Sequence, residues 1–280
     1  MSGAAFFFDT ADTDGIKKIW DKLGKHIDAK ACLGITTNPN ALAKVNCHTI
    51  ENFVKLVKSM SQTMDEITEG ALIYVQVPNS TATVAEINSW IKFVSGLDTG
   101  KSKIALKIPH FTYFLKNTRE ARNLFLNVTG VSDAGTIIKA LSYDQVSFAS
   151  IIPGRMEEVG IDANAHLKYL CDQNFKSHQK IITGSMRTIQ GLKDAIHYHT
   201  VPTVGTRVWD LFDLNDSWSE FPSYWHNLYQ TSTEPVADYC PETTDKNIDL
   251  SYQFFKQMDS LGSALYEDFK TCKACHDCLD

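Results

Sequence analysis

The sequence lacks a cluster of basic residues, a long hydrophobic run and a basic N-terminal segment. Its net charge of −6 argues against a nucleic-acid partner, because such partners are bound by clustered lysines and arginines. The first apolar run covers only residues 4–8, which is too short for a signal peptide or a membrane span. We therefore expect a cytoplasmic protein with no nucleic-acid partner and no membrane contact.

The seven cysteines lack the even, paired pattern of a disulfide framework. Scattered thiols without a secretory signal indicate a reducing compartment. Cys272, Cys275 and Cys278 have the spacing of metal ligands, but a structural zinc normally draws on a second pair of ligands, and none is evident. We expect a frayed tail and no metal, with zinc as the alternative. Three histidines are expected to be ordinary polar residues: His110, His197 and His199.

No G-x-G-x-x-G motif follows the first expected strand, and no repeat of fixed period is present. The first absence weakens a dinucleotide site, and the second argues against a solenoid. The chain instead contains eight short β-rich runs, over residues 4–8, 31–35, 71–77, 104–109, 124–128, 146–151, 180–183 and 201–204. Because these runs alternate with helical patterns, they predict a parallel sheet closed into a (β/α)8 TIM barrel. An open doubly wound sheet is the alternative.

Helical spacing and capping residues predict the crossover helices. These are expected over residues 16–23, 49–67, 84–94, 134–141, 163–170 and 188–196. Residues 208–214 are expected to form a short apolar turn, after which the composition changes. We therefore divide the chain into a barrel domain, residues 1–214, and a C-terminal segment, residues 215–280.

The C-terminal segment begins with an aromatic-rich stretch, residues 215–242. With an acidic net charge, an apolar patch under the following helix is favoured over a base-stacking role. The helix itself is expected over residues 246–269, with one apolar face. That face is predicted to contain Ile248, Tyr252, Phe255, Met258, Leu261 and Leu265.

A lysine, Lys107, stands near the end of the fourth apolar run, residues 104–109. Burying an unpaired charge costs several kcal/mol or forces the group to lose its proton. A neutral lysine amine is a nucleophile suited to Schiff-base formation with a carbonyl. The alternative is an edge strand that leaves Lys107 in solvent.

Polar side chains follow most of the other expected strands, at the end where barrel active sites are built. They are Asp9, Asn38, Gln76, Asn127, Thr129, Ser150, Arg155, Ser185 and Arg187. A carboxylate can transfer protons, amides can hold sugar hydroxyls and arginines can bind a phosphate. With Lys107, this set predicts a Schiff-base enzyme that acts on phosphorylated sugars and needs no cofactor and no metal.

Five short motifs resemble, in order, those of the transaldolase family, which includes the short fructose-6-phosphate aldolase-like enzymes. They are F-D-T-A at 8–11, G-I-T-T-N-P at 34–39, K-I-P at 107–109, N-V-T at 127–129 and G-R at 154–155. The resemblance covers residues 4–214, and G-I-T-T-N-P is its most specific part. With the lysine on the fourth strand, the chain resembles the short branch of the family.

The resemblance implies a (β/α)8 barrel and a catalytic role for four residues. Lys107 would attack the ketose carbonyl, and the resulting iminium would allow the C3–C4 bond to break and leave an enamine. Asp9 would exchange the proton of the C4 hydroxyl. Thr129 and Gln76 would surround the water that relays protons.

The resemblance also implies the substrate contacts. Asn38 would hold the donor hydroxyls, Ser150 would line the donor pocket and Asn127 would orient the surrounding groups. The phosphate would be bound by Arg155, Ser185 and Arg187. Ordinary structural roles are open as well: Asp9 as a helix cap, Asn38 as a turn residue and Thr129 as a hydroxyl bonded to its own backbone.

The chain departs from the family pattern at two positions. Gln76 stands where many transaldolases carry a glutamate, a change shared with the aldolase-like branch. Glutamine cannot titrate, so proton relay would depend more on Asp9 and water. Ile152 replaces an aromatic residue and removes the tyrosine hydroxyl that the aldolase-like branch uses. Ser150 and the missing tyrosine therefore favour transaldolase, whereas Gln76 favours aldolase.

Three functions follow from these patterns. The first is a transaldolase of the pentose phosphate pathway, which moves a dihydroxyacetone unit from sedoheptulose 7-phosphate or fructose 6-phosphate to an aldose phosphate. The second is an aldolase that uses free dihydroxyacetone, and the third is an inactive barrel that binds a sugar phosphate or a protein. The resemblance also implies that the C-terminal helix covers the barrel mouth or a neighbouring subunit, which leaves a homo-oligomer open.

Overall fold

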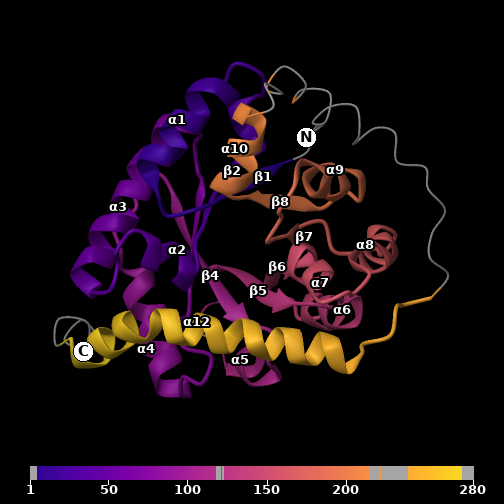
Figure 1. Cartoon of the computed structure of the whole chain (residues 1–280). Helices are drawn as coiled ribbons and strands as arrows, with labels where there is room; N and C mark the ends of the chain where they lie inside the picture. The colour runs from indigo at the N-terminus through magenta and orange to yellow at the C-terminus, as the bar shows by residue number, and fades with distance from the viewer. Residues whose placement is uncertain are drawn as a thin grey trace.

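The chain folds into a closed barrel of eight parallel strands (Figure 1). The computed structural model describes residues 5–117, 121, 123–214, 218, 221 and 239–272. The first strand pairs with both the second and the eighth, so the sheet has no free edge. The predicted (β/α)8 barrel is confirmed, and the open sheet is excluded.

The elements follow the predicted order. The strands are β1 (Phe6–Asp9), β2 (Cys32–Thr36), β3 (Leu72–Gln76), β4 (Lys103–Pro109), β5 (Phe125–Val131), β6 (Val146–Ile151), β7 (Lys180–Thr183) and β8 (Val201–Val204). The helices are α1 (Thr13–Leu23), α2 (Pro39–Lys44), α3 (Ile50–Ile67), α4 (Val84–Ser95), α5 (Thr112–Asn117), α6 (Ala134–Leu141), α7 (Pro153–Glu158), α8 (Ala163–Cys171), α9 (Ile189–His197), α10 (Thr206–Leu214) and α12 (Asp245–Thr271), with a 3-10 turn at Ala29–Ala31. None of these helices is long and apolar enough to cross a bilayer.

One expected element is wrong. Residues 208–214 belong to helix α10 and are not a turn. Val208, Trp209 and Phe212 are all buried, and the spacing of three and four residues between them places them on one helical face. Trp218 and Phe221, from the aromatic-rich stretch, pack against Trp209 at ring distances of 5.7 Å each. These two aromatic residues therefore extend the core around α10 and do not lie under the C-terminal helix. The rest of residues 215–238 lies outside the described residues.

Side chains capping the helices fix several loops at the carboxyl ends of the strands. A capping side chain accepts a hydrogen bond from a backbone N–H of the first helical turn and contributes about 1 kcal/mol. The caps are Asp12 for α1, Asn38 for α2, Thr83 for α4, Asp133 for α6 and Thr188 for α9. Because these caps set where each helix starts, they also set the direction in which each loop leaves its strand.

The barrel interior is layered, with aromatic rings below and polar groups above. Phe7, Tyr74 and Phe148 meet edge to face, with ring centroids 5.3–6.0 Å apart. We call these three rings the aromatic floor. Side chains alternate along a strand, so the residues two positions further on face the same interior. They are Asp9 on β1, Gln76 on β3 and Ser150 on β6.

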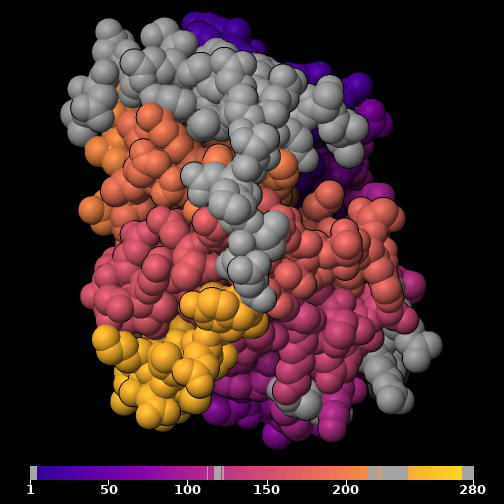
Figure 2. All heavy atoms as spheres, turned by 90° about the vertical axis from the view of Figure 1, so that its right-hand side faces the viewer, coloured from indigo at the N-terminus to yellow at the C-terminus, as the bar shows by residue number. Residues whose placement is uncertain are grey.

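The C-terminal helix α12 lies across the carboxyl ends of the strands. Figure 1 shows it, in yellow, passing the arrowheads of β4 and β5. Hydrogen bonds join its first turns to the end of β5 and the loop that follows: Ser132 Oγ donates to the carbonyl of Asn247 at 2.7 Å, and Ser251 Oγ donates to the carbonyl of Gly130 at 2.9 Å. Figure 2 shows this end of the helix in direct contact with the neighbouring barrel helices.

The buried face of α12 is the predicted one at Phe255, Met258 and Leu265, but it differs in the first turns of the helix. Ile248 and Tyr252 are 60% and 62% exposed, although both were expected on the apolar face. The helix is rotated so that Asn247 and Ser251 are buried instead. Their hydrogen bonds to β5 and to the loop that follows it stabilise this orientation of the helix. A prediction from the spacing of apolar residues does not include such polar contacts.

The cysteine-containing tail is described only at its start. Cys272 is a half-buried free thiol, whereas Cys275 and Cys278 lie outside the described residues. The frayed tail therefore stays a prediction. Among the described residues, no three His, Cys, Asp or Glu side chains form a group that could hold a metal ion.

Candidate active site

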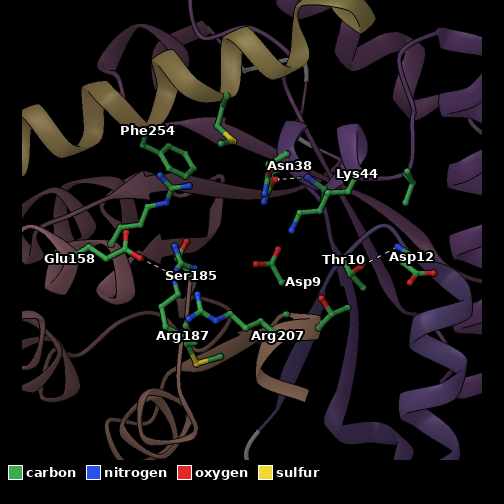
Figure 3. Close-up of a pocket in the computed structure, with 18 residues that line it drawn as sticks. Asp9, Thr10, Asp12, Asn38, Lys44, Glu158, Ser185, Arg187, Arg207 and Phe254 are labelled. Atoms are coloured by element: carbon green, nitrogen blue, oxygen red, sulfur yellow. Dashed lines mark hydrogen bonds and ion pairs between the residues drawn. The ribbon is translucent and has the colours of Figure 1, made fainter. Parts of the chain in front are cut away.

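A cavity of about 620 Å³ opens at the carboxyl ends of the strands (Figure 3). Its wall contains five of the ten predicted site residues: Asp9, Asn38, Arg155, Ser185 and Arg187. They come from the ends of β1, β2, β6 and β7, or from the loops and helices that follow directly. The barrel thus gathers into one wall residues that are up to 178 positions apart in the chain.

Lys107 lies in the polar layer of the barrel interior. Strand register places it between Gln76 of β3 and Asn127 of β5. Its side chain is 7% exposed, and Nζ donates a hydrogen bond of 3.0 Å to Thr36 Oγ1. The alternative of an edge strand with the lysine in solvent is therefore wrong. Burial lowers the pKa of the Lys107 amine, while the charge of Asp9 acts in the opposite direction.

Asp9 lies at the end of β1, where the barrel interior meets the cavity. Burial raises the pKa of its carboxyl group, and the charges of Lys107, Lys44, Arg187 and Arg155 partly offset this shift. No described cation lies within 4.0 Å of the carboxylate, so the group is not held in an ion pair. The capping role considered for Asp9 is wrong, because Asp12 caps α1. Asp9 is therefore available for proton transfer.

The other polar residues of the interior surround Lys107. Ser150 Oγ donates to Asn127 Oδ1 at 2.8 Å, which fixes the amide of the residue beside the lysine. Gln76 is 6% exposed, and its Oε1 has no hydrogen-bond partner among the described residues. A buried acceptor without a partner costs about 1–3 kcal/mol, so Gln76 is positioned to accept a hydrogen bond from a ligand or water. Thr129 is buried two residues after Asn127, on the same side of β5.

Asn38 combines its structural role with a place in the cavity wall. Its Oδ1 accepts a hydrogen bond of 2.9 Å from the backbone N–H of Ala41 and so caps α2. The amide nitrogen keeps both N–H groups, and Figure 3 shows the side chain at the cavity beside Asp9 and Lys44. Asn38 is thus a helix cap and not a turn residue, and its side-chain donors have no hydrogen-bond partner among the described residues.

The two predicted arginines lie on the side of the cavity formed after β6 and β7. Arg155 Nη1 donates to Gln257 Oε1 at 3.1 Å, and Arg187 Nε donates to Glu158 Oε1 at 2.9 Å. A Cβ atom on Gly154 would lie 2.0 Å from the carbonyl oxygen of Ser185, so this glycine allows the two loops to touch. The close approach brings both guanidinium groups to one wall.

The sequence reasoning missed several residues of the cavity wall. Lys44 and Arg207 contribute two more cations, and neither forms an ion pair within the described part of the chain. Phe254 and Met258 of α12 complete the wall. Lys44 is the last residue of α2, and Arg207 lies in the first turn of α10. A search for polar residues at strand ends therefore does not find them. Only the position of the following helices brings these residues back to the cavity.

The arrangement combines three chemical capacities. A buried amine with a lowered pKa can attack a carbonyl carbon. A buried carboxyl group with a raised pKa can give and take a proton. A wall that carries Lys44, Arg155, Arg187 and Arg207 can bind an anionic group.

Comparison with known proteins adds no family to these observations. No family model matches the chain, and no curated protein matches its sequence. The functional argument therefore rests on the residues themselves and on their arrangement in the barrel.

Proposed function

We propose that the protein is a Schiff-base transaldolase that moves a dihydroxyacetone unit from a ketose phosphate to an aldose phosphate. The observation that carries the proposal is the position of Lys107. The amine is buried inside a closed barrel, its pKa is lowered, and it interacts electrostatically with Asp9 next to a cavity lined by arginines. A packed barrel interior has no structural need for such a group.

The proposed reaction begins when the neutral Lys107 amine attacks the C2 carbonyl of the ketose phosphate. Loss of water gives an iminium, which withdraws electrons from the C3–C4 bond. Asp9, as carboxylate, takes the proton of the C4 hydroxyl while this bond breaks and an aldehyde leaves. The enamine that remains on Lys107 then attacks the acceptor aldehyde, Asp9 returns the proton to the new hydroxyl, and water releases the product.

The surrounding residues hold the substrate in this scheme. The free N–H groups of Asn38 donate to the donor hydroxyls, and the unpartnered Oε1 of Gln76 accepts from the reaction water. Ser150 and Asn127 line the pocket as a hydrogen-bonded pair, and Thr129 adds a hydroxyl to the same layer. Arg155, Arg187 and Ser185 bind the phosphate through charge-assisted hydrogen bonds.

The runner-up is an aldolase that releases free dihydroxyacetone. It is favoured by Gln76, which stands where many transaldolases carry a glutamate, a change shared with the aldolase-like branch. Product analysis separates the two functions. A transferase forms little free dihydroxyacetone without an acceptor aldehyde, whereas an aldolase forms it at the full rate.

Borohydride trapping with fructose 6-phosphate tests the proposal. Reduction during turnover, followed by peptide mass mapping, should give a reduced three-carbon adduct on Lys107. The adduct should be absent from Lys107→Met, which serves as the control. Folded wild-type protein without an adduct, or with an adduct on another lysine, would contradict the proposal and leave a barrel that only binds its ligand.

A further inference from the structure

The guanidinium group of Arg155 is held by helix α12. Nη1 donates to Gln257 Oε1 at 3.1 Å, and the guanidinium carbon lies 5.0 Å from the ring centroid of Phe254. Figure 3 shows the ring of Phe254 at the wall of the cavity, which Arg155 also lines. One face of α12 thus supplies both a hydrogen bond and a ring to a single arginine of the cavity wall.

These contacts differ from those of the neighbouring arginine. Glu158 neutralises part of the charge of Arg187, whereas Gln257 orients Arg155 and leaves its charge intact. Burial and the charge of Arg187 both lower the pKa of Arg155, which shows that the cation is held in an unfavourable place. Its buried Nε has no partner among the described residues, so a donor remains for a ligand. Without support from α12, repulsion from Arg187 would favour rotation of Arg155 away from the cavity.

The barrel is shaped to receive α12 at this position. A Cβ atom on Gly130 would lie 2.5 Å from the ring of Phe255, and one on Gly262 would lie 2.7 Å from the carbonyl oxygen of Pro78. Asp259 accepts hydrogen bonds from the backbone N–H and the hydroxyl of Ser80, at 2.7 and 2.5 Å. Close backbone approach at two places and hydrogen bonds between them fix the rotation of the helix. The direction of Gln257 and Phe254 follows from that rotation.

We propose that Gln257 and Phe254 are positioning residues that hold Arg155 ready for the phosphate of the substrate. Selectivity for phosphorylated over unphosphorylated sugars then depends on the C-terminal helix of the same chain. A long arginine side chain loses rotamer freedom when it binds, and α12 removes that freedom before the ligand arrives. This inference rests on the proposed function for the identity of the substrate, but the binding of phosphate that it predicts needs no Schiff base.

The test compares Gln257→Ala with Gln253→Ala. Gln253 is exposed one turn earlier on the same helix and makes no hydrogen bond within the described part of the chain, so it is a matched control. Calorimetric titration with inorganic phosphate should show binding about tenfold weaker in Gln257→Ala and unchanged in Gln253→Ala. The KM for fructose 6-phosphate should rise by a similar factor at unchanged kcat, while the kinetics with unphosphorylated fructose stay the same.

Two further variants separate positioning from folding. Phe254→Leu keeps an apolar side chain under α12 and should weaken phosphate binding through loss of the ring–cation contact. Gln257→Glu keeps the hydrogen bond but neutralises Arg155, so it should weaken phosphate binding more than Gln257→Ala. Wild-type phosphate affinity in Gln257→Ala, or an equal loss for phosphorylated and unphosphorylated substrates, would overturn the inference. Weaker phosphate binding in Gln257→Ala, together with no borohydride adduct on wild-type Lys107, would support it while contradicting the proposed function.

Discussion

Lys107 occupies a position that favours an apolar side chain. Directly below it in the barrel, Ala105 is completely buried beside the aromatic floor. The amine has one hydrogen bond, to Thr36, and no ion pair among the described residues. A group held in this way lowers the stability of the folded chain, and such a cost is typical of residues kept for chemistry.

We predict that Lys107→Met abolishes turnover and raises the free energy of unfolding by about 1 to 2 kcal/mol at pH 7. The folded-state pKa of Lys107 is lowered, so between this lowered value and the pKa of a free lysine the unfolded chain binds more protons than the folded one. The penalty therefore falls as the pH rises toward the pKa of a free lysine. The gain from Lys107→Met should accordingly be larger at pH 7 than at pH 10, as measured by urea unfolding. Lys103→Met, at the exposed start of the same strand, is the control.

Half of the predicted site residues line the cavity, and the other half lie on the strands inside the barrel. Asp9 could be predicted because it is the last residue of β1, and Ser185 because it follows β7 by two residues. Lys44 and Arg207 could not, because their positions depend on how α2 and α10 fold back. The contact of Arg155 with Gln257 joins residues 102 positions apart, and no local pattern encodes it.

At the scale of elements, the strands could be predicted from the sequence. The side of α12 that is buried in its first turns could not. Short β-rich runs bounded by polar residues mark the strands because both faces of a parallel barrel strand are buried. The apolar pattern of α12 gave its length and the buried residues Phe255, Met258 and Leu265. It did not give the burial of Asn247 and Ser251, which depends on hydrogen bonds to Ser132 and Gly130. The apolar pattern covers only residues 208–214. Helix α10 begins two residues earlier, with the polar residues Thr206 and Arg207.

His110 links β4 to α12 in a way that depends on pH. Its ring lies 4.7 Å from the ring of Phe111 and 5.6 Å from that of Phe255 on α12. Burial lowers the pKa of His110 to about 4, although the charge of Asp133 acts in the opposite direction. The imidazole is therefore neutral at pH 7, and it must take up a proton among aromatic rings when the solution becomes acidic.

We predict that His110 destabilises the folded chain between pH 6.5 and pH 4. The unfolded chain binds the proton near pH 6.5, whereas the folded chain binds it only near pH 4, so stability falls as the pH falls across this range. The loss at pH 4.5 is about 2 to 3 kcal/mol relative to pH 7.5. Thermal melts of His110→Phe at the two pH values should show a loss of stability that is smaller than the wild-type loss by about 2 to 3 kcal/mol. The exposed His48 gives the control, His48→Phe, and equal losses in the wild type and His110→Phe would contradict the prediction.

At the scale of the whole molecule, the C-terminal helix contributes to the cavity of its own chain. Helix α12 packs on α2, α3, α7 and β5 of its own barrel, and it supplies Phe254 and Met258 to its own cavity wall. Within the described part of the chain, α12 therefore needs no neighbouring chain to reach the site.

We predict that chains do not complement one another. When Lys107→Met is co-expressed with Gln257→Ala, the intact α12 of the first variant should not restore phosphate affinity in the second. The KM of the mixture for fructose 6-phosphate should equal that of Gln257→Ala alone, at every protein concentration. Light scattering would report whether mixed assemblies form. A fraction with wild-type KM in such an assembly would show that α12 serves a neighbouring chain.

The aromatic floor has a consequence for the order of events. Phe7, Tyr74 and Phe148 fill the barrel below Lys107, with at most 7% of each side chain exposed. The other side of Lys107 faces the carboxyl ends of the strands, where Phe254 and Met258 of α12 line the cavity. If the proposed transfer takes place at Lys107 and substrates enter from this side alone, the aldehyde released from the first sugar has to leave before the second sugar can bind. The two substrates would then bind in turn because the aromatic floor closes the lower end of the barrel, as well as because of the Schiff-base chemistry.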